Sequence, residues 1–217
     1  MRKQIQPLIV WAIVFLSAVG IPGQAKQIEK KAYQERVIKA LDDLREKSYR
    51  STTVSEKLND RDSKPVHVSK RIFEVIPPDK TRWIIEVDEE KREIVQIGQR
   101  RFVKSNRGNW KGDNEKRLVN KTIGSEQIES ESYTIDENAE LNGQKVILYE
   151  KSEKFKVVGD GAKDRRENLT TRFWLTRDGV LLRTQSELEN VDSKGFLRTT
   201  TDYEYDPKGL KIEAPVK

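Results

Sequence analysis

The segment of residues 71–110 constrains the fold of this chain more than any other segment. Its apolar residues alternate with charged ones in several short runs, which Pro77-Pro78, a mixed acidic and basic turn, and Gly98 interrupt. Alternation with a period of two sends successive side chains to opposite faces of a strand, and clusters of Pro, Gly, Asn and Asp mark the turns between strands. The segment therefore predicts antiparallel strands joined by hairpins, with one buried face and one solvated face.

The same pattern resumes along most of the chain that surrounds this segment. Asn142-Gly143 and Asp178-Gly179 are dipeptides typical of tight hairpin turns. Because consecutive strands usually lie next to one another, we expect about ten strands in sequential order in one large antiparallel sheet, which must curl or close. The predicted strands span residues 49–56, 66–76, 81–88, 92–97, 101–105, 132–135, 145–152, 155–158, 168–176, 180–189 and 196–205.

Residues 28–47 have the period of an amphipathic helix instead. Their apolar positions form one stripe, which consists of Tyr33, Val37, Ala40, Leu41 and Leu44. The sheet offers the only large apolar surface against which this stripe can pack, so we expect the helix to lie inside the curl, on the concave face. A helix at a membrane surface is the alternative, but such helices usually carry mostly Lys and Arg on their polar face, and this one mixes acids with bases. The predicted fold class is α+β, mainly β.

The first 25 residues differ from the rest of the chain. A basic start precedes an apolar run from Leu8 to Val19, and Ala25 ends a site with small residues at its first and third positions. This layout predicts a secretory signal peptide that is cleaved after Ala25. A retained membrane anchor is the alternative, but the run is shorter than the roughly 20 apolar residues that span a bilayer. We therefore predict a cleaved leader, residues 1–25, and a single exported domain, residues 26–217.

Several kinds of chemistry lack the residues that they need. The chain has no Cys, which excludes disulfides, a Cys nucleophile, thiolate metal sites and the acylated Cys of a bacterial lipoprotein. His67 is the only histidine, and its neighbours Val66 and Val68 point to the other face of the predicted strand. Acidic clusters such as residues 88–90 lie beside Lys and Arg and lack a calcium-loop pattern, which favours a solvated surface. We predict no enzyme activity, no catalytic residue, no metal and no cofactor.

The most basic stretch, residues 100–111, interleaves Arg and Lys with Phe102 and Trp110. Surfaces that bind nucleic acid have such stripes, but export argues against that partner. An anionic lipid headgroup or the membrane surface fits an exported protein better. Basic residues also keep the edges of a sheet from aggregating, and we favour this ordinary role. We predict no nucleic-acid partner.

Five segments, in this order along the chain, resemble the LolA/LolB-like superfamily of periplasmic carriers and sensors, which includes the outer-membrane lipoprotein carriers. They are LREKSYRSTTV, PPDKTRWIIEV, EIVQIGQRRFVKSNRGNWKGD, FWLTRDGVLLRTQSELEN and TTTDYEYDPKGLKIEAP. The resemblance implies a periplasmic protein with an unclosed, half β-barrel that wraps a helical lid around an apolar cavity. At one position the chain departs from carriers of the LolA type, which place an arginine directly before the proline of the first turn, where this chain has Pro77.

The resemblance and the predicted curl together favour a binding protein. One helix cannot cover the concave face of so large a sheet, so residual apolar surface should form a ligand cavity. The predicted inward, ligand-binding residues are Phe73, Trp83, Ile85, Ile97, Phe102, Trp110, Leu148, Phe173 and Leu175. In the alternative interpretation these residues are only core against the helix, and a slip of one residue in a strand would exchange its two faces.

The predicted ligand is an acyl chain of a lipid or lipoprotein, which the protein could carry toward the outer membrane. Movement of the helix and of a candidate lid, residues 111–130, would control its release. Membrane-associated release or receptor proteins are candidate partners. The alternative function is a sensor or interaction module that grips a peptide of another exported protein by strand addition.

Overall fold

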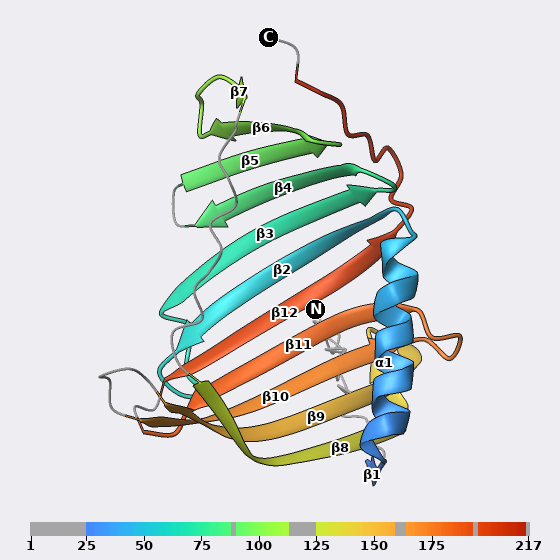
Figure 1. Cartoon of the computed structure of the whole chain (residues 1–217), viewed down its shortest axis with the longest axis vertical. Coiled ribbons are helices and arrows are strands. Elements are labelled where there is room, and N and C mark those ends of the chain that lie inside the picture. Colours follow the sequence, from blue (N-terminus) through green and yellow to red (C-terminus); the bar gives the residue numbers. More distant parts are fainter. Residues whose placement is uncertain (1–24, 88–89, 113–124, 159–163, 193–194, 216–217) are drawn as a thin grey trace, which may run out of the picture.

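The computed structural model describes residues 25–87, 90–112, 125–158, 164–192 and 195–215, which form one helix and one twelve-stranded antiparallel sheet (Figure 1). The helix, α1, spans Lys30–Arg45. The order of strands across the sheet is β1-β8-β9-β10-β11-β12-β2-β3-β4-β5-β6-β7. Their bounds are β1 Lys26–Gln27, β2 Tyr49–Leu58, β3 His67–Ile76, β4 Lys80–Val87, β5 Glu90–Ile97, β6 Arg100–Ser105, β7 Lys111–Gly112, β8 Ser125–Leu141, β9 Gln144–Val158, β10 Arg165–Leu175, β11 Leu181–Asn190 and β12 Phe196–Tyr205. The predicted α+β class, mainly β, is confirmed.

The sheet curves without closing into a barrel. Within the described residues its two edges are the short strands β1 and β7, which do not pair with each other. The longest strand, β8, has register shifts between Ile128 and Ser130 and between Asp136 and Ala139. Such β-bulges bend a strand and increase its twist, which helps the sheet to curl. The predicted unclosed half-barrel is therefore confirmed.

Helix α1 crosses one end of the strands on the concave face of the sheet (Figure 1). The predicted apolar stripe is the face that α1 buries, with Leu41 only partly buried. The stripe packs against a core from five strands, which consists of Tyr49, Tyr133, Tyr149, Leu175 and Leu181. The helix is shorter at both ends than the predicted span, residues 28–47. At its start, the Ile28 amide donates a hydrogen bond to the Tyr133 carbonyl at 3.1 Å, so the chain before Lys30 extends the sheet.

The second half of the sheet has longer strands than predicted. The segments 145–152 and 155–158 belong to one continuous strand, β9, and 132–135 is only the middle of β8. Of the candidate lid, residues 113–124 lie outside the described residues, and its described ends belong to β7 and β8. The predicted leader also lies outside them, apart from Ala25. The division into a leader and a single domain therefore stays a prediction.

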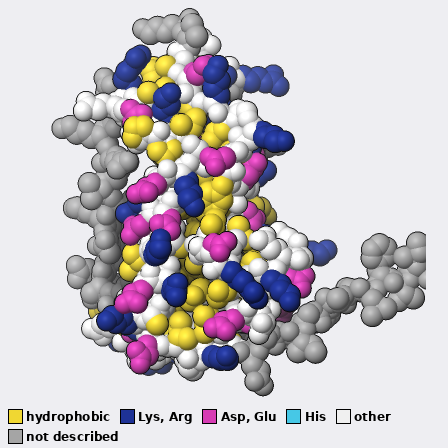
Figure 2. Space-filling view, turned by 90° about the vertical axis from the view of Figure 1, so that its right-hand side faces the viewer, with side chains coloured by type: hydrophobic (Ala, Val, Ile, Leu, Met, Phe, Trp, Pro, Cys, Tyr) yellow, Lys and Arg dark blue, Asp and Glu magenta, His cyan; other side chains and the backbone are white. Residues whose placement is uncertain are grey.

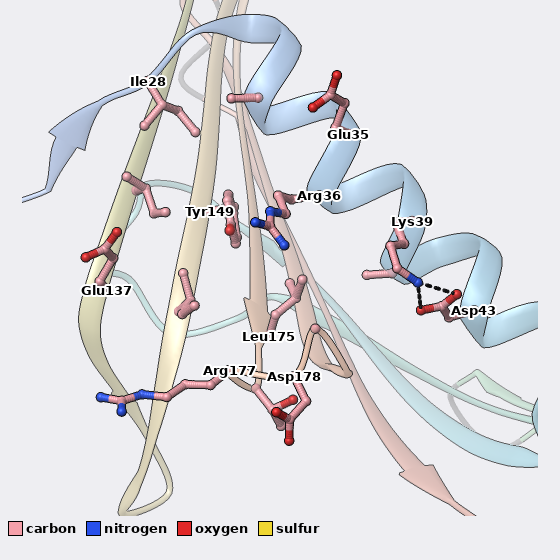
Figure 3. Close-up of a pocket in the computed structure, with 16 residues that line it drawn as sticks. Ile28, Glu35, Arg36, Lys39, Asp43, Glu137, Tyr149, Leu175, Arg177 and Asp178 are labelled. Carbon is pink, nitrogen blue, oxygen red and sulfur yellow. Dashed lines mark hydrogen bonds and ion pairs between the residues drawn. The ribbon is translucent and has the colours of Figure 1, made fainter.

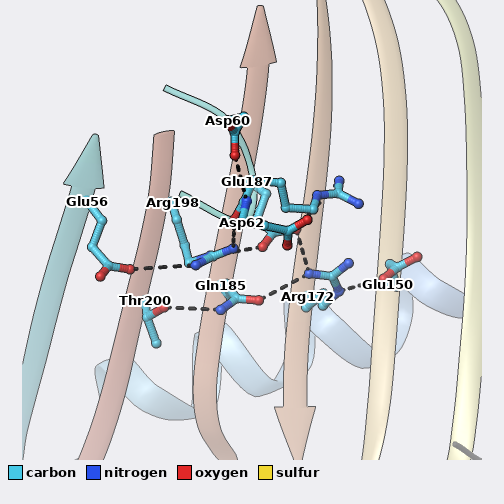
Figure 4. Close-up of polar contacts among 10 residues, drawn as sticks. Glu56, Asp60, Asp62, Glu150, Arg172, Gln185, Glu187, Arg198 and Thr200 are labelled. Atoms are coloured by element: carbon cyan, nitrogen blue, oxygen red, sulfur yellow. Dashed lines mark hydrogen bonds and ion pairs between the residues drawn. The ribbon is translucent and has the colours of Figure 1, made fainter. Parts of the chain in front are cut away.

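The convex face of the sheet, opposite α1, carries ion pairs between neighbouring strands (Figure 4). Part of this face is covered. The turn between β2 and β3 brings Arg61 to 3.9 Å from Glu187, and the segment after β12 buries Ile212 beside Val95. Apolar residues can therefore be buried on both faces of the sheet.

Candidate functional site

The register of the strands divides the predicted site residues between the two faces. Directly paired residues of antiparallel strands share a face, and the contacts of α1 identify the concave one. Phe73, Phe173 and Leu175 all pack with the core under α1. Trp83 pairs with Phe73, and Ile85 lies two residues further along the same strand. The concave face therefore brings these five residues to one side of the sheet.

Two further predicted residues, Ile97 and Phe102, face the other way. Arg82 precedes Trp83 and pairs with Val95, and Val95 in turn pairs with Phe102. Phe102 is therefore on the convex face, and Ile97, two residues after Val95, shares it. Simple alternation along each strand cannot reveal this division, because covered apolar residues occur on both faces.

Leu148 and Trp110 also lie on the convex side. Leu148 pairs with Trp174, which lies between two residues of the concave face. Trp110 lines a small hollow of about 130 Å³ together with Val95 and Ile212. The structure thus does not bring these two residues together with the concave set.

A groove of about 490 Å³ opens beside α1, between the helix and the ends of β8, β9 and β10 (Figure 3). Its volume is within the range of small-molecule sites. Apolar side chains line the groove. Ala32 and Ala40 come from α1, and the residues of its floor are Ile28, Ile135, Ile147, Tyr149 and Leu175. Charged side chains surround it, namely Glu35, Arg36, Lys39, Asp43, Glu137, Arg177 and Asp178. Figure 2, which views the side of the molecule where α1 lies, shows apolar side chains between charged ones of both signs.

The turn between β10 and β11 forms one end of the groove. Gly179 has a φ of +84°, a conformation that favours glycine, and this turn is the predicted Asp178-Gly179 hairpin. The Thr176 amide donates to the Val180 carbonyl at 2.8 Å, and the Val180 amide donates to the Thr176 hydroxyl at 3.0 Å. These bonds fix the turn, and with it the position of the groove's end.

Arg36 is the cation that points from α1 into the groove, beside Tyr149 (Figure 3). Burial raises the pKa of Tyr149, and the negative charge of Glu137 acts in the same direction, whereas the positive charge of Arg36 acts in the opposite one. Lys39, by contrast, donates to both carboxylate oxygens of Asp43, at 2.8 and 3.0 Å. Within the described part of the chain, neither the Arg36 guanidinium nor the Tyr149 hydroxyl forms a side-chain hydrogen bond or an ion pair.

Sequence reasoning identified only Leu175 among the residues that line the groove. A signal was nevertheless present in the helix, because Ala32, Arg36, Lys39 and Asp43 follow one another at intervals of four or three residues. They form a second stripe beside the buried one, at the border between the sheet and solvent. The sheet residues of the groove could not be found in this way, since only the packing of α1 brings them together.

Other features of the described residues bear on the predicted absence of catalysis. His67 is exposed at the start of β3. No group of three or more His, Cys, Asp or Glu residues that could hold a metal occurs in the part of the chain that the structure describes. The absence of enzyme activity and of a cofactor stays a prediction.

No helix in the described part of the chain is both long and apolar enough to cross a membrane.

The chain is similar to several solved structures. One is LprF from Mycobacterium bovis, at 10% identity over 88% of this chain and 100% of that one, with a TM-score of 0.46. Another is a LolA superfamily protein from Nitrosomonas europaea, at 11% identity over 82% and 92%, with a TM-score of 0.30. A third is a putative outer membrane lipoprotein-sorting protein domain from Vibrio parahaemolyticus, at 13% identity over 83% and 93%, also with a TM-score of 0.30. Neither a family model nor a curated protein sequence matches the chain.

Proposed function

We propose that this protein is an exported, periplasmic binding protein that holds acyl chains of a lipid or lipoprotein on the concave face of its open sheet. The observation that carries the proposal is the groove beside α1, which combines an apolar floor with a charged rim. An amphiphile matches this arrangement, because its chain can cover the floor while its polar head stays at the rim. Export rests on the predicted leader, and carriage toward the outer membrane rests on the sequence resemblance.

Apolar burial would supply the affinity. Each methylene that leaves water contributes about 0.8 kcal/mol, so even part of an acyl chain would bind measurably. The charged side chains of the rim can stay solvated while the chain occupies the floor, which avoids the cost of burying charge. No catalytic group is needed for this function.

The proposal extends to the concave surface on the other side of α1. Phe173 and Leu175 lie under the helix, and Phe73, Trp83 and Ile85 lie beyond it. These residues of the predicted set are partly exposed, apart from the buried Leu175. Helix α1 thus lies between two apolar surfaces, and its movement would open a path from one to the other and control release of the ligand.

Native mass spectrometry of the protein, purified gently from an exporting host, tests the proposal directly. We expect a bound mass of lipid size that disappears on delipidation and returns when phospholipid or acylated peptide is added. A protein that stays without ligand after both additions would refute acyl-chain binding.

A pair of matched variants locates the site. Ala32→Trp places a large side chain in the groove, and we expect it to weaken acyl-chain binding at least tenfold. Gln34→Trp is the control, because Gln34 is exposed on the same helix and does not line the groove. Equal binding by the two variants would place the acyl chain elsewhere.

One observation favours the alternative, an interaction module. β1 pairs only with Thr134 and Ile135 of the much longer β8. Among the described residues no other strand pairs with this edge of β8, so part of it is open to strand addition. A peptide partner would protect backbone amides of β8 from hydrogen exchange, whereas an acyl chain in the groove would leave those before Tyr133 unchanged.

A further inference from the structure

We propose that the groove beside α1 selects amphiphiles with an anionic group, and that Arg36 and Tyr149 bind this group. The inference rests on the proposed function, since it specifies the head chemistry of the ligand that would occupy the groove. The anion would be a carboxylate or a phosphate.

The two side chains come from different elements that line the groove, Arg36 from the helix and Tyr149 from the sheet. Arg36 projects from α1 toward the sheet, and Tyr149 stands on β9 in the floor, with only 5% of its surface exposed (Figure 3). The guanidinium and the phenol are both hydrogen-bond donors at neutral pH. Since neither group has a side-chain partner among the described residues, a ligand oxygen between them would satisfy both donors without breaking an existing bond.

The remaining charges of the rim do not occupy the same space. Lys39 is paired with Asp43, and Arg177 extends away from Arg36 (Figure 3). The Glu35 carboxylate, at the rim, is directed away from Arg36, and Glu137 stands on β8, on the far side of Tyr149 from Arg36 (Figure 3). Of the two charges that act on the Tyr149 hydroxyl, Arg36 has the larger effect and Glu137 opposes it, so the balance beside Tyr149 is positive although the rim as a whole is mixed.

The sheet side of this position is apolar. Ile147 and Leu175 line the groove together with the buried Tyr149, whereas Arg36 lies on the exposed side of α1. Attraction between charges is larger where the surroundings are less polar than water. Arginine also binds carboxylate and phosphate through two parallel hydrogen bonds, a geometry that lysine cannot provide.

Binding of four probes that share one chain tests the inference. Dodecanoate, dodecyl phosphate, dodecanol and dodecyltrimethylammonium are titrated into the delipidated protein by calorimetry, below their micelle concentrations and at about pH 8, where the carboxylate is ionised. We expect dodecanoate or dodecyl phosphate to bind about tenfold more tightly than dodecanol, as one charge-assisted hydrogen bond provides. Preference for the carboxylate would indicate a free fatty acid as ligand, and preference for the phosphate a phospholipid.

The variants separate this inference from the proposed function. Arg36→Gln should lose the preference for the anion while dodecanol binds as before, and Tyr149→Phe should lose part of it. Arg45→Gln is the matched control, because Arg45 is an exposed arginine of the same helix that pairs with Asp42 outside the groove. Equal binding of all four probes, or an unchanged preference in Arg36→Gln, would overturn the inference alone. Failure of every probe to bind would overturn the proposed function with it.

Discussion

The ring of Tyr33 on α1 lies 4.9 Å from the ring of Tyr133 on β8, with the two planes inclined by 55°. Tyr33 also contacts Tyr149 on β9 and Phe173 on β10 in edge-on geometry, both at 6.3 Å between centroids. One helical side chain therefore bridges three neighbouring strands. This contact holds the first turns of α1 against the sheet, where the groove begins.

We predict that Tyr33→Ala lowers the free energy of unfolding by about 3–5 kcal/mol, because removing a large buried side chain leaves a cavity. Tyr33→Phe should cost less than about 1 kcal/mol, since the ring contacts remain. Urea denaturation measures both values. Ile38→Ala on the same helix is the control, since Ile38 is 53% exposed and should matter by no more than about 0.5 kcal/mol. Equal stability of Tyr33→Ala and Ile38→Ala would show that this contact does not hold the helix.

The buried and partly buried tyrosines of the concave face should make the fold sensitive to alkaline pH. Burial raises the pKa of Tyr49 and of Tyr205 to about 12. A group whose pKa is raised on folding contributes stability that is complete below its unfolded pKa, about 10 for tyrosine, and is lost as the pH rises through the folded value. We therefore expect the free energy of unfolding to fall between about pH 10 and pH 12.

Spectrophotometric titration of the phenolates, together with urea denaturation at each pH, checks this expectation. Tyr205→Phe should show a smaller loss of stability in the alkaline range, because it removes one titrating group. It also removes the hydrogen bond of 2.6 Å from the Tyr205 hydroxyl to the Leu181 carbonyl, so the slope with pH is the quantity to compare. If all tyrosines ionise near pH 10 in the folded protein, the burial argument is wrong.

The sequence predicted the sheet, the buried stripe of α1 and the hairpin turns, because each depends on local patterns. Asn142 and Gly143 both have positive φ, at 53° and 80°, as the tight turn between β8 and β9 requires. The pairing of Phe73 with Trp83 likewise follows from alternation on either side of one turn. Local patterns thus determined where strands and turns occur.

The extent of β8 and the faces of individual strands depend on contacts between distant parts of the chain. The start of β8 reads SEQIESES, with polar residues on both faces, because it lies near an edge of the sheet and needs no apolar alternation. Phe102 and Leu148 read as inward residues, but the register places them on the convex face. The proposed role of Arg36 in binding an anionic group likewise depends on the packing of α1 beside Tyr149, which no local pattern reveals.

Trp83 provides a test of the concave surface beyond α1. Its ring stacks on Phe73 with centroids 4.9 Å apart and planes inclined by 29°. If acyl chains reach this surface, a lipid with brominated chains should quench the fluorescence of Trp83. Trp174 is the control, because it lies on the opposite face of the sheet.

Two variants of the processed protein isolate these signals. Trp110→Phe combined with Trp174→Phe leaves only Trp83, and Trp83→Phe combined with Trp110→Phe leaves only Trp174. We expect strong quenching in the first variant and little in the second. Equal quenching would contradict the assignment of faces, and a lack of quenching in both would restrict the ligand to the groove.

On the convex face, Glu187 holds neighbouring strands together (Figure 4). Its carboxylate accepts hydrogen bonds from Arg172 on β10 at 2.9 Å and from Arg198 on β12 at 3.0 Å. Glu187 is only 7% exposed. Replacing its carboxylate would leave the two arginines without the negative charge that they share, in a place that water hardly reaches. We predict that Glu187→Gln lowers the free energy of unfolding by about 3 kcal/mol at neutral pH. Glu189→Gln, at an exposed site on the same strand, should change it by no more than about 0.5 kcal/mol.

The pH dependence of this difference identifies its electrostatic origin. Burial opposes the ionisation of Glu187, but the hydrogen bonds and charges of Arg172 and Arg198 outweigh it, so the pKa is lowered. A lowered pKa contributes stability that is present above the unfolded value, about 4.3, and is lost as the pH falls through the folded value. The gap between the native protein and Glu187→Gln should therefore be largest near neutral pH and shrink in acid. Urea denaturation at neutral pH and at about pH 3 measures it, and a gap that stays constant would indicate a packing effect instead.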